Sequence, residues 1–185
     1  MKNILIVSGH TDLNNSVANK NILNRLKEKL PNAEFDLLSE LYPNYRIDIE
    51  KEQNKLLKAD IIVLQYPVFW YSMPSLLERW MEEVFKHGFS HGSTGDKLKG
   101  KKIIVSLTTG APEEAYSKEG RMGHEIEDFL NPIKVTCKEC QMELLGIIKT
   151  YGVSYQIRNE KRNEIINKTN AHVEQLLNLV NKEEE

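Results

Sequence analysis

The chain alternates short apolar runs with longer amphipathic segments. The short runs are rich in branched side chains and contain no turn signal, so they predict buried strands. They cover Lys2–Ser8, Ala33–Leu38, Ile61–Tyr66, Lys102–Leu107 and Met142–Ile148. Apolar residues three or four positions apart predict helices at Ser16–Leu30, at Glu50–Ala59, after Pro74, within Ile126–Cys140 and at Glu160–Asn181. The apolar side of the last helix holds Ile166, Thr169, Val173, Leu176 and Val180. This alternation predicts one doubly wound α/β domain across residues 1–185.

An aromatic loop follows the third predicted strand. Bulky or rigid residues stand where a loop is usually small and polar: Pro67, Phe69, Trp70 and Tyr71. Pro74 then opens a helix, in which Ser75 and Glu78 have the spacing of a capping box. The loop therefore lies at the carboxyl end of a strand, where open α/β sheets bind ligands. A flat, apolar ligand would suit it, although the aromatics could equally cover core or a subunit interface.

The loop Gly9–Ser16 after the first strand is polar and leads into a helix. Free N–H groups and the helix dipole attract anions at such a start, and His10, Asn15, Ser16 and Asn19 add side-chain donors. The simpler alternative is that Ser16 only caps the helix. The chain has no GxGxxG after this strand and no GxxxxGK[ST], which argues against a Rossmann dinucleotide site and a P-loop.

The fourth strand ends in Thr108-Thr109-Gly110-Ala111-Pro112. Hydroxyl groups and glycine at this position suit a close backbone approach to the polar edge of a ring. The loops after strands one, three and four meet in one crevice if the sheet has the flavodoxin-like order 2-1-3-4-5, with helices on both faces. We therefore expect a five-stranded parallel sheet of that order.

Composition narrows the classes of function. The chain has 185 residues, 40% of them hydrophobic and 28% charged, with a formal net charge of −2. This balance gives no electrostatic case for binding nucleic acid. No apolar run approaches a membrane span or a signal-peptide core, so we expect a cytoplasmic protein.

Two pairs of potential metal ligands occur. Cys137 and Cys140 supply only half of a four-cysteine site, and a structural or incidental role is expected. His87 and His91 are four residues apart, but Gly88 and Gly92 disfavour the helix that would place them on one face. We expect no metal site.

The segment PVFWYSMPSLLERWMEEVFKHGF resembles the flavin loop and following helix of the flavodoxin-like NAD(P)H:quinone oxidoreductases. The matching residues are Pro67, Trp70, Pro74, Val84, Phe85 and Gly88. The resemblance extends from about Ile4 to Gly152 and is greatest to small bacterial members, including those that assist glutathione-regulated potassium efflux.

This resemblance implies a flavin site. The implied phosphate ligands are His10, Ser16, Val17, Ala18 and Asn19. Pro67, Val68, Phe69 and Trp70 would lie along the ring, with the Val68–Trp70 amides near its N5 side, and Thr108, Thr109, Gly110 and Ala111 would contact its pyrimidine side. Ala111 replaces a family glycine, so a different local turn is expected. Tyr116 matches a catalytic tyrosine, but Met122 occupies the position of its histidine partner, which leaves His124 as the secondary candidate.

The implied activity is ping-pong hydride transfer from NADH or NADPH to the flavin and then to a quinone. The short chain favours FMN, with FAD possible. Family members are homodimers, so an exposed aromatic patch is expected. The alternative is a flavin-binding ancillary subunit that regulates a potassium-efflux system and associates with a membrane transporter.

Overall fold

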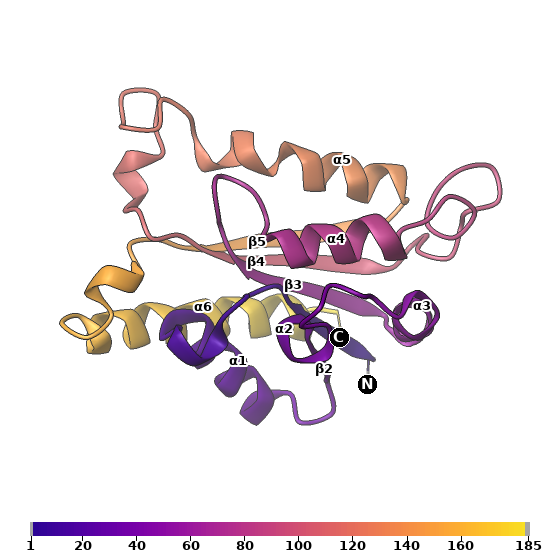
Figure 1. Ribbon diagram of the computed structural model, residues 1–185, viewed down its shortest axis with the longest axis horizontal. Coiled ribbons are helices and arrows are strands. Elements are labelled where there is room, and N and C mark those ends of the chain that lie inside the picture. Colours follow the sequence, from indigo (N-terminus) through magenta and orange to yellow (C-terminus); the bar gives the residue numbers. More distant parts are fainter. Residues whose placement is uncertain (1, 184–185) are drawn as a thin grey trace.

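The computed structural model describes residues 2–183 and contains one parallel sheet (Figure 1). Its strands are β1 (Ile4–Ser8), β2 (Glu34–Leu37), β3 (Ile61–Pro67), β4 (Lys102–Thr108) and β5 (Glu143–Thr150). They are hydrogen-bonded in the order β2-β1-β3-β4-β5, and every neighbouring pair is parallel. The predicted order is confirmed. It brings the carboxyl ends of β1, β3, β4 and β5 to one edge.

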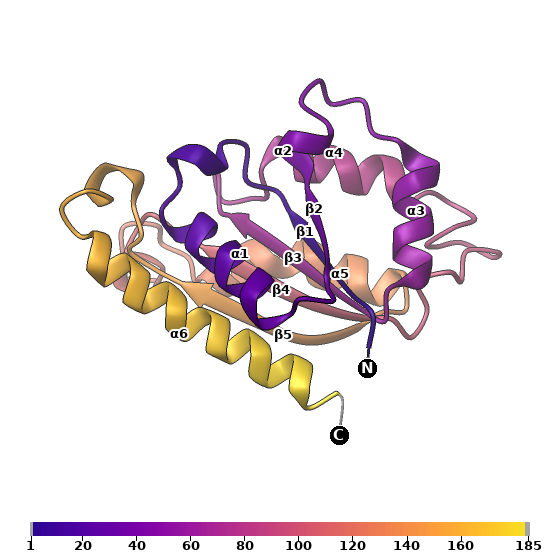
Figure 2. The ribbon, with the colours of Figure 1, turned by 90° about the horizontal axis from the view of Figure 1, so that it is seen from below.

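Helices cover both faces of the sheet (Figures 1 and 2). One face carries α1 (Ala18–Lys29) and α6 (Arg162–Asn181). The other carries α2 (Leu38–Leu41), α3 (Ile49–Lys58), α4 (Ser75–Val84) and α5 (Asn131–Glu139). Short 3-10 turns are η1 (Leu13–Asn15), η2 (Glu113–Ala115), η3 (Ile126–Leu130) and η4 (Tyr155–Ile157). Of the helices in residues 2–183, none is both long and apolar enough to cross a membrane.

The central strand β3 shows why the apolar runs are continuous. Ile62 and Leu64 pack into the core under α4 and α5, whereas Ile61 and Val63 pack into the core under α1 and α6. Successive side chains of a strand point to opposite faces, and a parallel sheet is covered on both. Both sets must therefore be apolar, which removes the polar alternation of a half-exposed strand.

The start of α4 differs from the prediction. Pro74 occupies the N-cap position, and it provides no side-chain cap. Glu78 instead accepts a hydrogen bond from the hydroxyl of Ser72, and Ser75 hydrogen-bonds to Tyr45 at 2.8 Å. The predicted Ser75–Glu78 capping box is therefore wrong. The short helix α2 was also not expected from the sequence.

The last helix follows its predicted apolar pattern with one shift. Thr169, Val173, Leu176 and Val180 are buried as expected, but Ile165 is buried in place of the half-exposed Ile166. His172 is also buried on this side, which the pattern did not predict. The two cysteines, Cys137 and Cys140, are free thiols inside the core, in agreement with a structural role.

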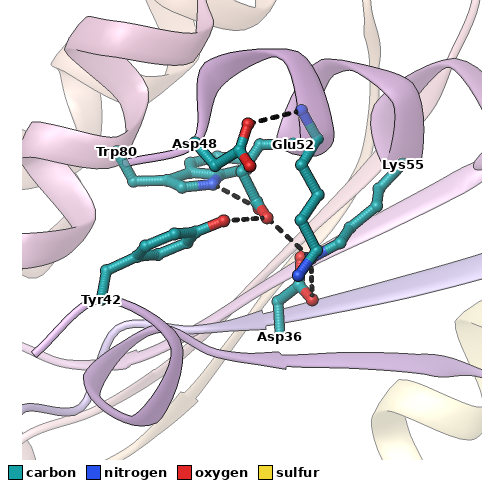
Figure 3. Close-up of polar contacts among 7 residues, drawn as sticks. Asp36, Tyr42, Asp48, Glu52, Lys55 and Trp80 are labelled. Atoms are coloured by element: carbon teal, nitrogen blue, oxygen red, sulfur yellow. Dashed lines mark hydrogen bonds and ion pairs between the residues drawn. The ribbon is translucent and has the colours of Figure 1, made fainter. Parts of the chain in front are cut away.

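A buried ionic cluster joins β2 to α3 and α4 (Figure 3). Lys55 donates to Asp36 and to Glu52, each at 2.6 Å. Glu52 also accepts from the Tyr42 hydroxyl at 2.7 Å and from the indole N–H of Trp80 at 2.8 Å. All five side chains are withdrawn from solvent, so this polar group depends on mutual hydrogen bonds for its stability.

Candidate functional site

A cavity of about 1350 Å³ lies at the carboxyl edge of the sheet. The loops after β1, β3 and β4 all line it, which confirms that these loops converge. From the residues expected in a flavin site, the cavity wall includes His10, Ser16, Val17, Ala18, Asn19, Pro67, Val68, Phe69, Thr108, Thr109, Gly110 and Ala111. Trp70, Tyr116 and His124 lie outside the set of described residues that line it.

The start of α1 forms one end of the cavity. The first intrahelical bond at this end runs from the Asn21 amide to the Val17 carbonyl at 3.0 Å, so the Ala18 N–H precedes the helical ladder. Ser16 accepts a hydrogen bond from the Asn19 amide at 3.1 Å. Such a helix start, with N–H groups and a positive dipole end directed at the cavity, favours an anionic group.

His10 lies between the helix start and the aromatic loop. Its Nδ1 accepts the Asp12 amide proton at 3.0 Å, and its ring meets Phe69 edge-on with centroids 6.1 Å apart. Burial lowers the pKa of His10, although the nearby Asp12 charge opposes this. A neutral imidazole that accepts at Nδ1 carries its proton on Nε2. His10 is therefore a fixed hydrogen-bond donor at the cavity wall.

The aromatic loop has an unusual backbone. Phe69 and Ser72 exchange two backbone hydrogen bonds of 3.0 Å, and the intervening Trp70 and Tyr71 have φ of +47° and +64°. Positive φ at both central residues is typical of type I′ turns, where Asn and Gly are usual. Bulky side chains hold this conformation at a cost, and such strain concentrates at functional sites. The turn leaves Trp70 92% exposed.

Two amides of this loop are engaged within the protein. The Val68 N–H donates to the Thr108 carbonyl at 2.8 Å, and the Phe69 N–H donates to the Ser72 carbonyl at 3.0 Å. Both amides therefore already have partners within the protein, and their place near the N5 side of a flavin stays a prediction. The bond from Val68 ties the aromatic loop to the end of β4.

The Thr108–Ala111 segment accommodates alanine without strain. Neither Gly110 nor Ala111 is among the residues of the 2–183 range with positive φ. The Ala111 carbonyl accepts from the Gly152 amide at 2.9 Å and from the Thr109 hydroxyl at 2.8 Å. The backbone therefore turns here without the left-handed conformation that would require a second glycine.

Tyr116 is half-buried next to this segment. Its ring lies among Phe129 and Tyr151, at centroid distances of 6.3 and 5.9 Å. Burial raises the pKa of Tyr116, although its hydrogen bond with Thr109 opposes this. Tyr116 is therefore a protonated donor adjoining a residue of the cavity wall.

Met122 and His124 make other contacts. The Tyr71 hydroxyl donates to the Met122 sulfur at 3.3 Å. His124 is 3.2 Å from the Asp128 carboxylate and its side chain is 63% exposed. The structure does not bring His124 to the cavity wall. Within residues 2–183, no cluster of three or more His, Cys, Asp or Glu side chains is arranged to hold a metal ion.

A fourth loop completes the cavity and was missed from the sequence. The segment after β5 contributes Tyr151, Gly152, Val153, Ser154 and Tyr155, and His172 contributes from α6. The signal was available in part, because a loop after any strand of a parallel sheet reaches the same edge. Five basic side chains also border this side: Arg121, Lys149, Arg158, Lys161 and Lys168.

The residues of the cavity fit a flavin mononucleotide. Hydrogen-bond donors of His10, Ser16 and the α1 start gather at one end, as an anionic phosphate needs. Pro67, Val68 and Phe69 give an apolar wall beside them, as a flat ring needs.

Fold and cavity thus define a doubly wound α/β protein with a cavity at the carboxyl edge of its parallel sheet. The chain belongs to the family described as having a flavodoxin-like fold, which matches residues 2–177. It is 38% identical over 163 residues to the NAD(P)H oxidoreductase YrkL of Bacillus subtilis, covering 88% of this chain and 92% of that protein.

Two further comparisons bear on the site. The chain is 39% identical over 142 residues to KefF of Enterobacter sp. (strain 638), an ancillary protein of the glutathione-regulated potassium-efflux system, covering 77% of this chain and 79% of KefF. The structure also resembles general stress protein 14 from Treponema denticola in complex with FMN. The TM-score is 0.87 and the identity 26%, over 96% of this chain and 99% of that one.

Proposed function

We propose that this protein is an FMN-dependent NAD(P)H:quinone oxidoreductase. The observation that carries the proposal is the cavity, which joins the anion-binding start of α1 to the Pro67–Phe69 wall and the Thr108–Ala111 segment. The similarity to the NAD(P)H oxidoreductase YrkL and to the Treponema protein in complex with FMN supports the same function. FMN is preferred to FAD because the cavity offers one anion-binding helix start beside the ring wall.

The residues of the chain have distinct roles in this proposal. A bound flavin would take hydride from NADH or NADPH and deliver it to a quinone, so the two substrates would use one pocket in turn. Ser16, the Ala18 amide and His10 hold the phosphate. Phe69 covers apolar ring surface, and Thr109 orients the polar edge. Tyr116 donates a hydrogen bond where negative charge develops, with His124 as a secondary candidate.

We further propose that the protein is a cytoplasmic homodimer. Phe69, Trp70 and Tyr71 are 41%, 92% and 42% exposed, and they are adjacent in sequence beside the cavity. Large exposed aromatic groups commonly mark interaction sites. A second copy of the chain is the expected partner, and it would cover Trp70 and close the pocket over the flavin ring.

The similarity to KefF favours a second function: a flavin-binding ancillary subunit that associates with a potassium-efflux transporter. The two functions differ in turnover. An enzyme consumes NAD(P)H continuously in the presence of quinone, whereas a purely regulatory subunit binds the flavin without sustained turnover.

The experiment starts from the purified protein and its absorbance spectrum. We expect a yellow protein that NADH or NADPH bleaches and that a quinone recolours, with steady turnover and ping-pong kinetics. The released cofactor should have the mass of FMN. A protein that binds FMN without turning over would support the ancillary function, and a protein that binds no flavin would refute both.

A further inference from the structure

A chain of buried hydrogen bonds runs behind the cavity from α6 to α1. His172 of α6 contacts Ser106 of β4 at 2.6 Å, and Ser106 donates to Gln65 of β3. Gln65 donates to Asn19 of α1 at 2.8 Å. Each of these four side chains is no more than 3% exposed. These hydrogen bonds thus link α6 to α1 along one face of the sheet, over β4 and β3, and the side chains at both ends, His172 and Asn19, line the cavity.

The hydrogen bonds from His172 to Asn19 all run in one direction, with each side chain donating to the next. Gln65 directs its N–H₂ to Asn19, so its oxygen faces Ser106 and accepts the single hydroxyl proton there. The Ser106 oxygen then accepts from His172 Nε2. His172 Nδ1 is 2.8 Å from the Thr150 hydroxyl. Burial lowers the pKa of His172 to about 4, so the ring is neutral. Because Ser106 gives its only proton to Gln65, the neutral ring that matches this direction has its proton on Nε2 and accepts from Thr150 at Nδ1.

The other end of the chain reaches the cavity. The side-chain oxygen of Asn19 accepts a hydrogen bond from Gln65. The N–H₂ group of Asn19 is therefore directed to the hydroxyl of Thr108 at 3.0 Å and to that of Ser16 at 3.5 Å. Both hydroxyls accept from Asn19, which leaves their own protons available for another acceptor. Ser16 and Thr108 both line the cavity, and Ser16 stands at the start of α1.

The opposite direction would remove these donors. If the Gln65 amide turned round, its N–H₂ would face Ser106 and its oxygen would accept from Asn19. Asn19 would then present its oxygen to Ser16 and Thr108, whose protons would point away from the cavity. The Nε2–H of His172 opposes this state, because Ser106 would then accept from both His172 and Gln65 and its own buried proton would lose the acceptor that Gln65 provides.

We infer that His172 is a positioning residue which, through Ser106, Gln65 and Asn19, holds the hydroxyls of Ser16 and Thr108 as donors toward the phosphate of the cofactor. The inference rests on the proposed function, since it concerns the phosphate of FMN. It assigns a role in cofactor binding to a residue of α6, a helix that lines the same cavity as Pro67–Phe69.

The test compares the affinities of the apoprotein for FMN and for riboflavin, which lacks the phosphate. The ratio of the two dissociation constants isolates the phosphate contribution and can be measured from the quenching of flavin fluorescence. In His172→Phe, we expect FMN affinity to fall about tenfold, as for the loss of one charge-assisted hydrogen bond. Riboflavin affinity should fall much less, because riboflavin has no phosphate, so the ratio of the two dissociation constants should change. His172→Gln can still donate to Ser106 and should retain most of the ratio.

Thr169→Val is the matched control. Thr169 is fully buried on the same helix and accepts from Asn21 of α1 at 2.8 Å, outside the chain of hydrogen bonds. Loss of the Thr169 hydroxyl should lower the stability of the fold and leave the ratio of the dissociation constants for FMN and riboflavin unchanged. If His172→Phe does not fold, Ser106→Ala carries the same prediction, because it removes only the hydroxyl that fixes the Gln65 amide.

The outcomes separate this inference from the proposed function. An unchanged ratio in folded His172→Phe or Ser106→Ala overturns the inference and leaves the proposed function in place. Equal losses for FMN and riboflavin also overturn it, since they indicate a general structural role. A wild-type protein that binds neither ligand refutes the proposed function itself, and the inference with it.

Discussion

The hydroxyl of Tyr71 donates to the sulfur of Met122 at 3.3 Å, and this contact joins the aromatic loop to the segment after η2. In the resembling quinone reductases a histidine occupies the position of Met122 and pairs with the tyrosine that Tyr116 matches. The methionine has no exchangeable side-chain proton. It serves instead as a packing and acceptor partner for a tyrosine held at positive φ.

We therefore expect Tyr116 to carry the proposed proton-donor role without a histidine at position 122 to assist it. Tyr116→Phe should slow flavin reduction by NAD(P)H about tenfold, equal to ~1.4 kcal/mol of barrier, because it removes one donor from developing charge. His124→Ala should have a smaller effect, since His124 is exposed and near Asp128. Stopped-flow bleaching of the flavin measures both rates. A slow His124→Ala with a normal Tyr116→Phe would reverse the assignment.

Ser16→Asp tests the anion-binding end of the cavity. A carboxylate at this position should repel the phosphate and give mostly colourless protein that still folds. Asn14→Asp adds the same charge to an exposed residue of the same loop that does not line the cavity, and it should stay yellow. Flavin content per chain measures cofactor binding, and circular dichroism measures folding. Full flavin content in Ser16→Asp would place the phosphate elsewhere.

Trp70→Ala tests the aromatic loop. Ala occupies positive φ about as poorly as Trp, so the substitution removes the ring while leaving the backbone strain in place. We expect flavin affinity to fall by ~1 kcal/mol or more, since the indole should cover ring area across the dimer. The dimer should also weaken, which sedimentation measures. Unchanged flavin affinity and dimerisation would remove Trp70 from the site.

The sheet order and most of the cavity wall could be predicted from the sequence. Apolar runs locate parallel strands, and the carboxyl ends of parallel strands meet at one edge. The loops that hold Ser16, Phe69 and Thr109 were therefore expected to converge, and they do. These features depend on local patterns and on a rule of topology, both of which a single chain displays.

Tertiary contacts were harder to predict. His172 lies between apolar residues of a helix, and its partners Ser106 and Thr150 belong to strands distant in sequence. The exposure of Trp70 depends on a left-handed turn that bulky residues rarely adopt. At the start of α4, the spacing of a capping box was present, but Ser72 reached Glu78 instead. Each case was decided by three-dimensional proximity.

The ionic cluster of Figure 3 makes Glu52 its central acceptor. Burial alone would raise the pKa of Glu52, but hydrogen bonds from Lys55, Tyr42 and Trp80 outweigh this and lower it. Glu52→Gln should destabilise the fold by ~3 kcal/mol, because its N–H₂ would face a buried donor where a carboxylate oxygen now accepts, and Lys55 would keep Asp36 as its only carboxylate partner in the cluster. Urea unfolding measures the change. A loss within ~0.5 kcal/mol, as at ordinary surface sites, would contradict the central role.

Asp36 gives the same cluster a dependence on pH. Burial, together with the nearby Glu52, raises the pKa of Asp36 from 3.8 to about 7, and Lys55 opposes this. The cluster holds one cation and two carboxyl groups, so a proton on Asp36 balances its charge. Between about pH 4 and 7 the folded chain keeps a proton that the unfolded chain releases. Stability from this group is therefore complete at low pH and falls as pH rises through that window.

Asp36→Asn should remove this dependence. The amide keeps an acceptor for Lys55 and leaves the Lys55–Glu52 pair balanced, so the variant should gain stability relative to wild type as pH rises from 4 to 8. Each unit of pKa difference corresponds to about 1.4 kcal/mol, which predicts a relative gain of a few kcal/mol across the window. Urea unfolding at several pH values measures it. If the stability of the two proteins changed with pH in the same way, Asp36 would be ionised in the folded protein across this range, and the proposed proton on Asp36 would be ruled out.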